Sequence, residues 1–149
     1  MTEPRQFFIY ADDDPDSLIL MRLALRKLNT TVSVVDCADG AGLIDLLINT
    51  LENSLPLPRF VLLDQKMPHV DGLEAVRWIR NKPELRRLPV YIFSSSALPT
   101  DLEQALSAGA DDYIVKPIGL DDLRQQLKRL LSRLGITFMA SQTARVTSF

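Results

Sequence analysis

The stretch "FFIYADDDPDSL", from Phe7 to Leu18, joins a short apolar run to three consecutive aspartates and the start of an amphipathic segment. The apolar run is rich in aromatic and branched residues, which is typical of a buried strand. Pro15 suits the first turn of a helix, and Leu18 begins an apolar pattern with spacings of three and four. Neighbouring carboxylates repel one another, so a positive group, most simply a metal ion, is expected to offset that cost.

The same unit of a strand followed by a helix recurs along the chain. Similar apolar runs predict strands at 6–11, 31–36, 59–64, 89–94 and 112–116. Leucine-rich patterns predict a helix after each strand. The fourth helix is marked by Leu102, Ala105 and Leu106, and the fifth extends from Leu120 to Leu134. Strict alternation predicts an α/β fold, a doubly wound parallel sheet with helices on both faces.

Composition excludes several classes of protein. The 149 residues, 46% hydrophobic and 24% charged, are typical of one globular domain. No apolar run approaches the roughly 20 residues that cross a bilayer, and "MTEPRQ" does not resemble a secretory signal, so we expect a cytoplasmic protein without a membrane partner. With 17 basic and 19 acidic residues and no long basic cluster, nucleic-acid binding has little support, and a protein partner is expected.

Polar side chains follow the predicted strands where each strand ends. Asp12 and Asp13 follow the first strand, Asp64 the third, Ser94 the fourth and Lys116 the fifth. Ligands of such sheets bind beyond the carboxyl ends of the strands, so we expect these side chains to meet at one edge. Randomly placed polar groups would not all fall at strand ends, so this convergence is stronger evidence for a site than any single motif.

The aspartates also have plainer interpretations. Asp14, which precedes Pro15, is expected to cap the first helix. Capping needs one carboxylate and leaves Asp12 and Asp13 unexplained. Together with Asp64 they provide oxygen ligands that suit Mg²⁺, whereas the regular spacing and glycine of a calcium loop are absent from the sequence.

The third-strand aspartate is the candidate for covalent chemistry. An aspartate at a strand end is often only a turn former. Beside Mg²⁺ and Lys116, however, Asp64 is a credible nucleophile toward a phosphoryl group. Ser94 either belongs to a polar loop before the next helix or donates a hydrogen bond to a phosphoryl oxygen. Lys116 is either solvated or presents a cation to the carboxylates.

Four ordered motifs, "DDD", "LLDQKMPHVDG", "SSS" and "VKP", each follow a strand and together resemble the receiver (CheY-like) domain of two-component response regulators. The resemblance extends from about Gln6 to Leu134. It implies a flavodoxin-like five-stranded sheet of order 2-1-3-4-5, an order for which receivers are a known example. It also implies a signalling domain that catalyses only its own phosphorylation and dephosphorylation, and not a classical enzyme.

The resemblance assigns roles to the acidic residues. Asp64 would accept a phosphoryl group from the phosphohistidine of a histidine kinase or phosphotransfer protein. Asp13 and Asp64 would bind Mg²⁺ directly, together with the backbone carbonyl of Lys66. Asp12 would contribute to the metal site largely through water.

The resemblance likewise assigns the switch. Ser94 stands where the family more usually has threonine, and would follow the phosphoryl group. Lys116 would pair with that group, and Tyr113 would be the aromatic residue that changes rotamer. The added charge would then favour an alternative packing around the fourth and fifth strands.

We expect residues 1–134 to form the receiver domain and residues 135–149 to form a C-terminal extension. The extension is either a loose tail or a segment that docks on the domain or on a second copy. The length leaves no room for an output domain, which predicts a stand-alone receiver that changes partners or dimerises. A homodimer would use the extension or the face of the fourth helix, fifth strand and fifth helix.

Two other functions compete with this one. A haloacid-dehalogenase-type phosphatase would use Asp12 as the nucleophile and Asp14 as the acid. That function would leave Asp64 without a role, and the chain is short for that class. A phosphorylation-independent interaction module would keep the fold but not the chemistry.

Overall fold

The computed structural model describes residues 6–138, in which strands and helices alternate as the sequence predicts. The strands are β1 (Phe7–Ala11), β2 (Ser33–Cys37), β3 (Val61–Leu63), β4 (Val90–Ser94) and β5 (Asp112–Val115). The helices are α1 (Pro15–Arg26), α2 (Gly40–Glu52), α3 (Gly72–Arg80), α4 (Pro99–Ala108) and α5 (Leu120–Arg133), with a short 3₁₀ helix η1 (Pro83–Leu85) before β4.

The strands form one parallel sheet of order β2-β1-β3-β4-β5, which confirms the predicted fold class. In its centre Ala11 of β1 lies opposite Leu63 of β3. The residues that follow these two, Asp12 and Asp64, therefore leave the sheet side by side.

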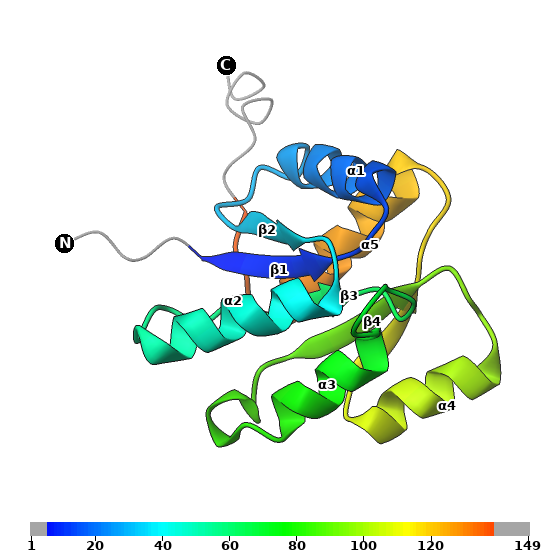
Figure 1. Cartoon of the computed structure of the whole chain (residues 1–149). Helices are drawn as coiled ribbons and strands as arrows, with labels where there is room; N and C mark the ends of the chain where they lie inside the picture. Colours follow the sequence, from blue (N-terminus) through cyan, green and yellow to red (C-terminus); the bar gives the residue numbers. More distant parts are fainter. Residues whose placement is uncertain (1–5, 139–149) are drawn as a thin grey trace, which may run out of the picture.

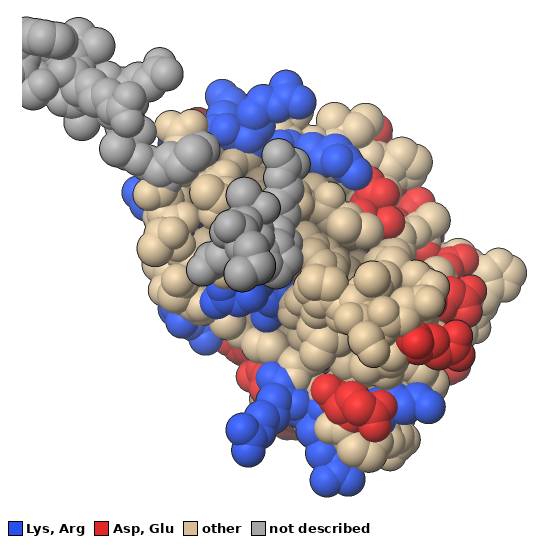
Figure 2. Space-filling model, turned by 90° about the vertical axis from the view of Figure 1, so that its left-hand side faces the viewer, with Lys and Arg blue, Asp and Glu red and all other residues tan. Residues whose placement is uncertain are grey.

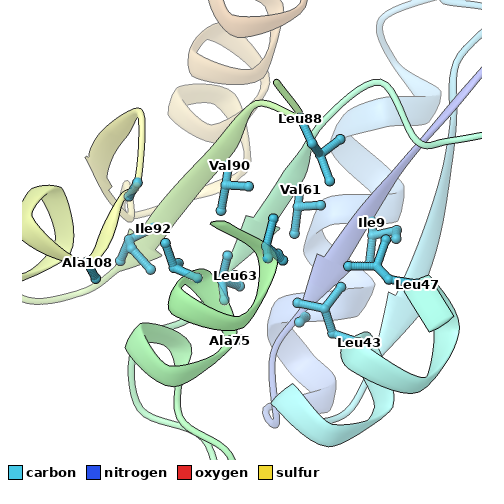
Figure 3. Close-up of a cluster of buried hydrophobic side chains, with 14 of the residues drawn as sticks. Ile9, Leu43, Leu47, Val61, Leu63, Ala75, Leu88, Val90, Ile92 and Ala108 are labelled. Atoms are coloured by element: carbon cyan, nitrogen blue, oxygen red, sulfur yellow. The ribbon is translucent and has the colours of Figure 1, made fainter. Parts of the chain in front are cut away.

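Helices cover both faces of the sheet (Figure 1). Side chains alternate between the two faces along each strand, so each face has its own core. On the α2, α3 and α4 side, strand residues such as Ile9 and Leu63 face Leu43, Leu47 and Ala75 of the helices (Figure 3). The core on the other face lies under α1 and α5 and contains larger, mainly aromatic strand side chains. It includes Phe8, Tyr10, Phe60, Tyr91, Phe93, Met21, Leu127 and Leu131.

Local sequence signals explain where helices begin and end. Pro15 and Pro99 occupy first turns, and the Asp14 side chain accepts a hydrogen bond of 3.0 Å from the Asp16 amide, as a cap should. Gly109 ends α4 with a φ of 115°, a left-handed conformation that glycine adopts at little cost. The predictions that Asp14 caps the first helix and that Pro15 lies in its first turn are confirmed.

The fourth helix is present as predicted, but its leucines do not pack inward. Leu102 and Leu106 are 38% and 47% exposed, whereas the small side chains of Ala105 and Ala108 are buried against the sheet. Leu98, just before the helix, is 61% exposed. Residues 98, 102 and 106 are spaced by four and therefore share one outward apolar face of α4.

The chain continues to pack on the domain after α5. Ile136 is only 4% exposed, within the α1 and α5 core, and the Leu134 carbonyl accepts a 2.6 Å hydrogen bond from Arg59. Phe138 pairs with Thr30 in an isolated antiparallel bridge. Residues 139–149 lie outside the described part of the chain, so the choice between tail and docking segment stays a prediction for them.

Figure 2 shows the side of the molecule from which β1 enters the sheet. On this face Lys and Arg side chains lie in several separate groups, and Asp and Glu side chains lie mainly along one margin. The described residues visible on this side therefore do not form the continuous basic surface that typically binds a nucleic-acid backbone. No helix within residues 6–138 has the length and apolar character needed to cross a membrane.

Candidate functional site

Three carboxylates gather at the carboxyl ends of β1 and β3. Asp12, Asp13 and Asp64 each offer an oxygen, and these atoms lie within 4.8 Å of one another. The strand pairing causes this, since the Asp64 amide donates a 2.9 Å hydrogen bond to the Ala11 carbonyl. Oxygen ligands in this number are what Mg²⁺ takes from proteins, with waters or phosphate completing its shell. The residues therefore fit the ion that the sequence predicts.

Asp12 is the buried member of the cluster. It is 0% exposed, and both of its carboxylate oxygens accept hydrogen bonds. Oδ1 accepts from the Asp14 amide at 2.9 Å. Oδ2 accepts from Tyr10 Oη at 2.7 Å and from Lys116 Nζ at 2.6 Å. These donors stabilise a carboxylate that burial alone would penalise.

Lys116 bridges the two central carboxylates. Its Nζ lies 2.6 Å from Asp12 Oδ2 and 3.4 Å from Asp64 Oδ2, and its side chain is 19% exposed. The backbone holds it there, because the Lys116 amide donates a 2.7 Å hydrogen bond to the Ser94 carbonyl. Burial lowers the pKa of the Lys116 ammonium, but the hydrogen bonds and charges of Asp12 and Asp64 outweigh burial and raise it overall. Lys116 therefore keeps its positive charge near neutral pH.

Asp64 is partly open to solvent, with 16% of its side chain exposed. Burial raises the pKa of Asp64, Lys116 opposes that shift, and the neighbouring charge of Asp12 adds to it. One cation against three carboxylates leaves excess negative charge, which a divalent cation would balance. Asp64 therefore offers a reachable oxygen in an electrostatically incomplete site.

The loop after β3 is held close to this acceptor. The Lys66 amide lies 3.4 Å from Asp64 Oδ1, and the Gly72 amide donates a 2.8 Å hydrogen bond to the Gln65 carbonyl. A Cβ at Gly72 would lie 2.4 Å from the Asp64 carbonyl oxygen, so this close approach requires glycine. Asp71 caps α3 by accepting from the Glu74 amide at 2.9 Å. His69 lies exposed in this loop.

The predicted switch residues contact the loop between β4 and α4. Ser94 is 5% exposed, and its Oγ accepts a 3.3 Å hydrogen bond from the Ser96 amide. Tyr113 Oη donates a 2.8 Å hydrogen bond to the Ser96 carbonyl, and the Ser96 hydroxyl donates to Asp101. Ser94 and Tyr113 are thus linked through Ser96, and their roles as switch residues stay predictions.

The structure brings Asp12, Asp13, Asp64 and Lys116 together, which are four of the residues singled out from strand ends. Reasoning from strand ends alone misses Tyr10, because its hydroxyl comes from within β1. The available signal is a tyrosine two residues before Asp12, since residues two apart on a strand face the same side. Burial, with the nearby charge of Asp12, raises the pKa of Tyr10 far above its ordinary value. Tyr10 therefore donates a proton to this bond and does not accept one.

Comparison with known proteins agrees with this geometry. A family model for the response regulator receiver domain matches residues 8–128. The chain belongs to the response regulator receiver family. This receiver is 30% identical over 128 residues to the probable methanogenesis regulatory protein FilR2 of Methanothrix harundinacea, covering 86% of this chain and 82% of that protein.

Two further relatives differ in how much of their own length this receiver covers. It is 35% identical over 141 residues to the transcriptional regulatory protein PrrA of Mycobacterium tuberculosis, covering 95% of this chain but 55% of PrrA. It is 28% identical to the bacteriophytochrome response regulator AtBRR, with a TM-score of 0.74 and coverage of 94% of this chain and 99% of that structure.

Family membership decides between the receiver and the haloacid-dehalogenase-type phosphatase. A receiver is a signalling domain and not a haloacid-dehalogenase-type phosphatase. The geometry agrees, because Asp12, the nucleophile in that alternative, is buried and hydrogen-bonded through both oxygens.

Proposed function

We propose that this receiver accepts a phosphoryl group on Asp64 from the phosphohistidine of a histidine kinase or phosphotransfer protein. The observation that carries the proposal is the meeting of three carboxylates and Lys116 at one sheet edge, with Asp64 partly open. The predicted cytoplasmic location belongs to the same proposal, because such donors phosphorylate receivers there.

The transfer step needs positioning more than covalent assistance. A carboxylate oxygen of Asp64 attacks phosphorus while the bond from phosphorus to the donor imidazole nitrogen breaks. The electron pair of that bond stays on the imidazole, which then takes up a proton. Lys116 Nζ, 3.4 Å from Asp64 Oδ2, is close enough to pair with an oxygen of the transferred group.

Mg²⁺ is the proposed cofactor. Asp13 and Asp64 would hold it with the backbone carbonyl of Lys66, and Asp12 would act largely through water. When bound, Mg²⁺ would neutralise charge on the carboxylates and on the phosphoryl oxygens. The support is the donor set itself, since carboxylate oxygens in this number suit a hard cation.

The signal would leave through the face of α4, β5 and the start of α5. Movement of Ser94 and Lys116 toward the phosphoryl group would change the packing of the β4–α4 loop, to which Tyr113 is hydrogen-bonded. Exposed apolar side chains often mark interaction sites. This face carries five of them: Leu98, Leu102, Leu106, Val115 and Ile118, the last 94% exposed. A protein partner or a second copy would bind here.

Mass spectrometry after treatment with acetyl phosphate and Mg²⁺ tests the acceptor. We expect a gain of one phosphate that acid hydroxylamine removes, because acyl phosphates are labile to nucleophiles. Asp64→Asn should take up none, whereas Asp45→Asn, on the exposed surface of α2, should behave as wild type. Phosphate on Asp64→Asn at the wild-type level would contradict the assignment.

Sizing of the modified and unmodified protein then tests the output. A phosphate-dependent increase in size would support a homodimer, and Leu102→Ser with Leu106→Ser should abolish it if α4 is the interface. Unchanged partner binding by Asp64→Asn would instead favour a phosphorylation-independent interaction module.

A further inference from the structure

One oxygen of Asp12 is shared by two donors that differ in freedom of movement. Asp12 Oδ2 accepts from Tyr10 Oη at 2.7 Å and from Lys116 Nζ at 2.6 Å. Lys116 stands on a long aliphatic stem and already reaches Asp64 Oδ2 at 3.4 Å. It can therefore move toward a group attached to Asp64 by a short change of its side chain.

Tyr10 cannot move in the same way. It is 1% exposed, and its ring packs edge-on against Phe93 with centroids 5.9 Å apart. It also lies two residues before Asp12, which directly follows the last residue of β1, so both side chains face the same side of the sheet. The hydroxyl is therefore a fixed donor.

Phosphorylation of Asp64 would draw Lys116 away from Asp12, and Tyr10 would remain as a hydrogen-bond donor to Asp12. An ammonium that pairs with the phosphoryl group must loosen its contact with Asp12, whose carboxylate is 0% exposed and cannot turn to water. A buried carboxylate oxygen that loses its donor is costly. Without another donor Asp12 would hold Lys116 back. With Tyr10 in place, Oδ2 keeps a hydrogen bond after Lys116 leaves.

We propose that Tyr10 is a positioning residue that retains the Asp12 carboxylate while Lys116 transfers from Asp12 to the phosphoryl group on Asp64. The proposal rests on the proposed function of Asp64 as acceptor. It assigns Tyr10 no contact with the phosphoryl group, so its effect is exerted through Asp12 and Lys116.

Tyr10→Phe removes the hydroxyl and keeps the ring. We expect the maximal rate constant for phosphorylation by acetyl phosphate to fall about tenfold, the size expected for one hydrogen bond to a charged group. The acetyl phosphate concentration that gives half the maximal rate should stay unchanged, because Tyr10 does not touch the donor. Tyr91→Phe, at a buried tyrosine of the same core in β4, should stay within about twofold of wild type.

A double-mutant comparison separates this role from a merely structural one. In a Lys116→Ala background there is no ammonium to release, so Tyr10→Phe should cause no further loss of rate. Additive losses would mean that Tyr10 acts independently of Lys116, and the proposal would be wrong. The comparison measures whether the rate losses caused by Tyr10→Phe and Lys116→Ala depend on each other. General loosening of the core would not produce such a dependence.

A crystal structure of the wild-type protein with beryllofluoride and Mg²⁺ gives a test that needs no variant. We expect Tyr10 Oη to stay within hydrogen-bond distance of Asp12 Oδ2 and Lys116 Nζ to lie closer to a fluoride than to Asp12. A Tyr10 hydroxyl that has left Asp12 would overturn the proposal. If wild type takes up no phosphate, the proposed function fails; if it does and Tyr10→Phe is equally fast, only the inference about Tyr10 fails.

Discussion

Asp12 and Asp13 are neighbours in the chain but stand in opposite environments. Successive side chains at the end of a strand point to opposite sides, which buries Asp12 against Tyr10 and leaves Asp13 exposed. Both oxygens of Asp12 are already hydrogen-bonded, whereas Asp13 is open to a ligand. This difference supports the prediction that Asp13 binds Mg²⁺ directly and that Asp12 acts through water.

Removal of the exposed aspartate should therefore remove metal-dependent stability. A Mg²⁺ concentration about ten times the Kd should add about 1.4 kcal/mol to the unfolding free energy and raise the Tm by about 3–6 °C. Asp13→Ala should lose this shift, and Asp45→Ala in α2 should keep it. Thermal scans with and without Mg²⁺ measure it; an equal shift in Asp13→Ala would argue against a metal site at this edge.

The single cysteine should be unreactive in the folded protein. Burial, with the charges of Asp36 and Asp39, raises the pKa of the Cys37 thiol from 9.0 to about 11, which reduces the thiolate fraction near neutral pH about 100-fold. The rate of iodoacetamide alkylation should therefore keep rising above about pH 9 in the folded protein, whereas the denatured protein approaches a plateau there. A folded protein that reaches its plateau by that pH would contradict the shift.

At the residue scale, strand-end positions were enough to predict which side chains meet. Asp12, Asp64 and Lys116 could be placed together because parallel strands end at one edge. The hydrogen bonds among them could not be predicted, since they depend on side-chain directions that a sequence does not specify. Tyr10 shows this, because its place two residues before Asp12 indicates a shared side of the sheet but not a hydrogen bond between its hydroxyl and Asp12.

At the element scale, one arginine links the ends of two helices and the segment before β4. Arg80, at the end of α3, donates to the carbonyls of Gly109 at 2.7 Å and Leu88 at 2.8 Å, and pairs with Asp111 at 2.8 Å. Its guanidinium also donates to the Arg86 carbonyl at 3.2 Å. These partners come from the residues that follow α4 and from the turn after η1. Arg80 therefore holds the carboxyl ends of α3 and α4 and the turn before β4 in place relative to one another.

Arg80→Met should destabilise the fold by about 2–3 kcal/mol, because it leaves several carbonyls without a donor while keeping the aliphatic stem. Arg77→Met, on the exposed side of the same helix, should change stability by less than about 0.5 kcal/mol. Urea unfolding with a common m-value measures the difference. Equal midpoints for the two variants would mean that solvent replaces the Arg80 contacts without cost.

Element order and type followed from the sequence, but the orientation of α4 did not. A spacing of three and four predicts a helix and cannot say which of two apolar groups faces the sheet. Alanines at 105 and 108 let α4 lie close to its neighbours, so the larger Leu102 and Leu106 are left outside. The outward leucines are the side chains that the proposed partner or second copy would cover, which is what the sizing experiment addresses.

At the scale of the whole molecule, the core is closed by residues beyond α5. Ile136 is buried among α1 and α5 side chains, and the Ile136 amide donates a 2.9 Å hydrogen bond to the Leu131 carbonyl. Helical periodicity ends at Leu134, so the pattern alone could not indicate that the following residues pack. Burial of a single side chain after a helix leaves no periodic signal in the sequence.

Ile136→Ala should cost about 2–4 kcal/mol, as for other large-to-small changes in a packed core. Thr137→Ala, at the exposed neighbouring position, serves as the matched control and should be nearly neutral. Thermal and urea unfolding both report the loss. A neutral Ile136→Ala would mean that this segment contributes little to the core.

The pairing of Ala11 with Leu63 determines when the carboxylate site is assembled during folding. The two central aspartates come from strands about fifty residues apart and meet only in this one alignment. A displacement by one residue would send one of them to the wrong side and remove one of the two carboxylates that Lys116 contacts. A chain in which β1 and β3 are not aligned in this register therefore lacks the site that the proposed phosphoryl transfer to Asp64 needs.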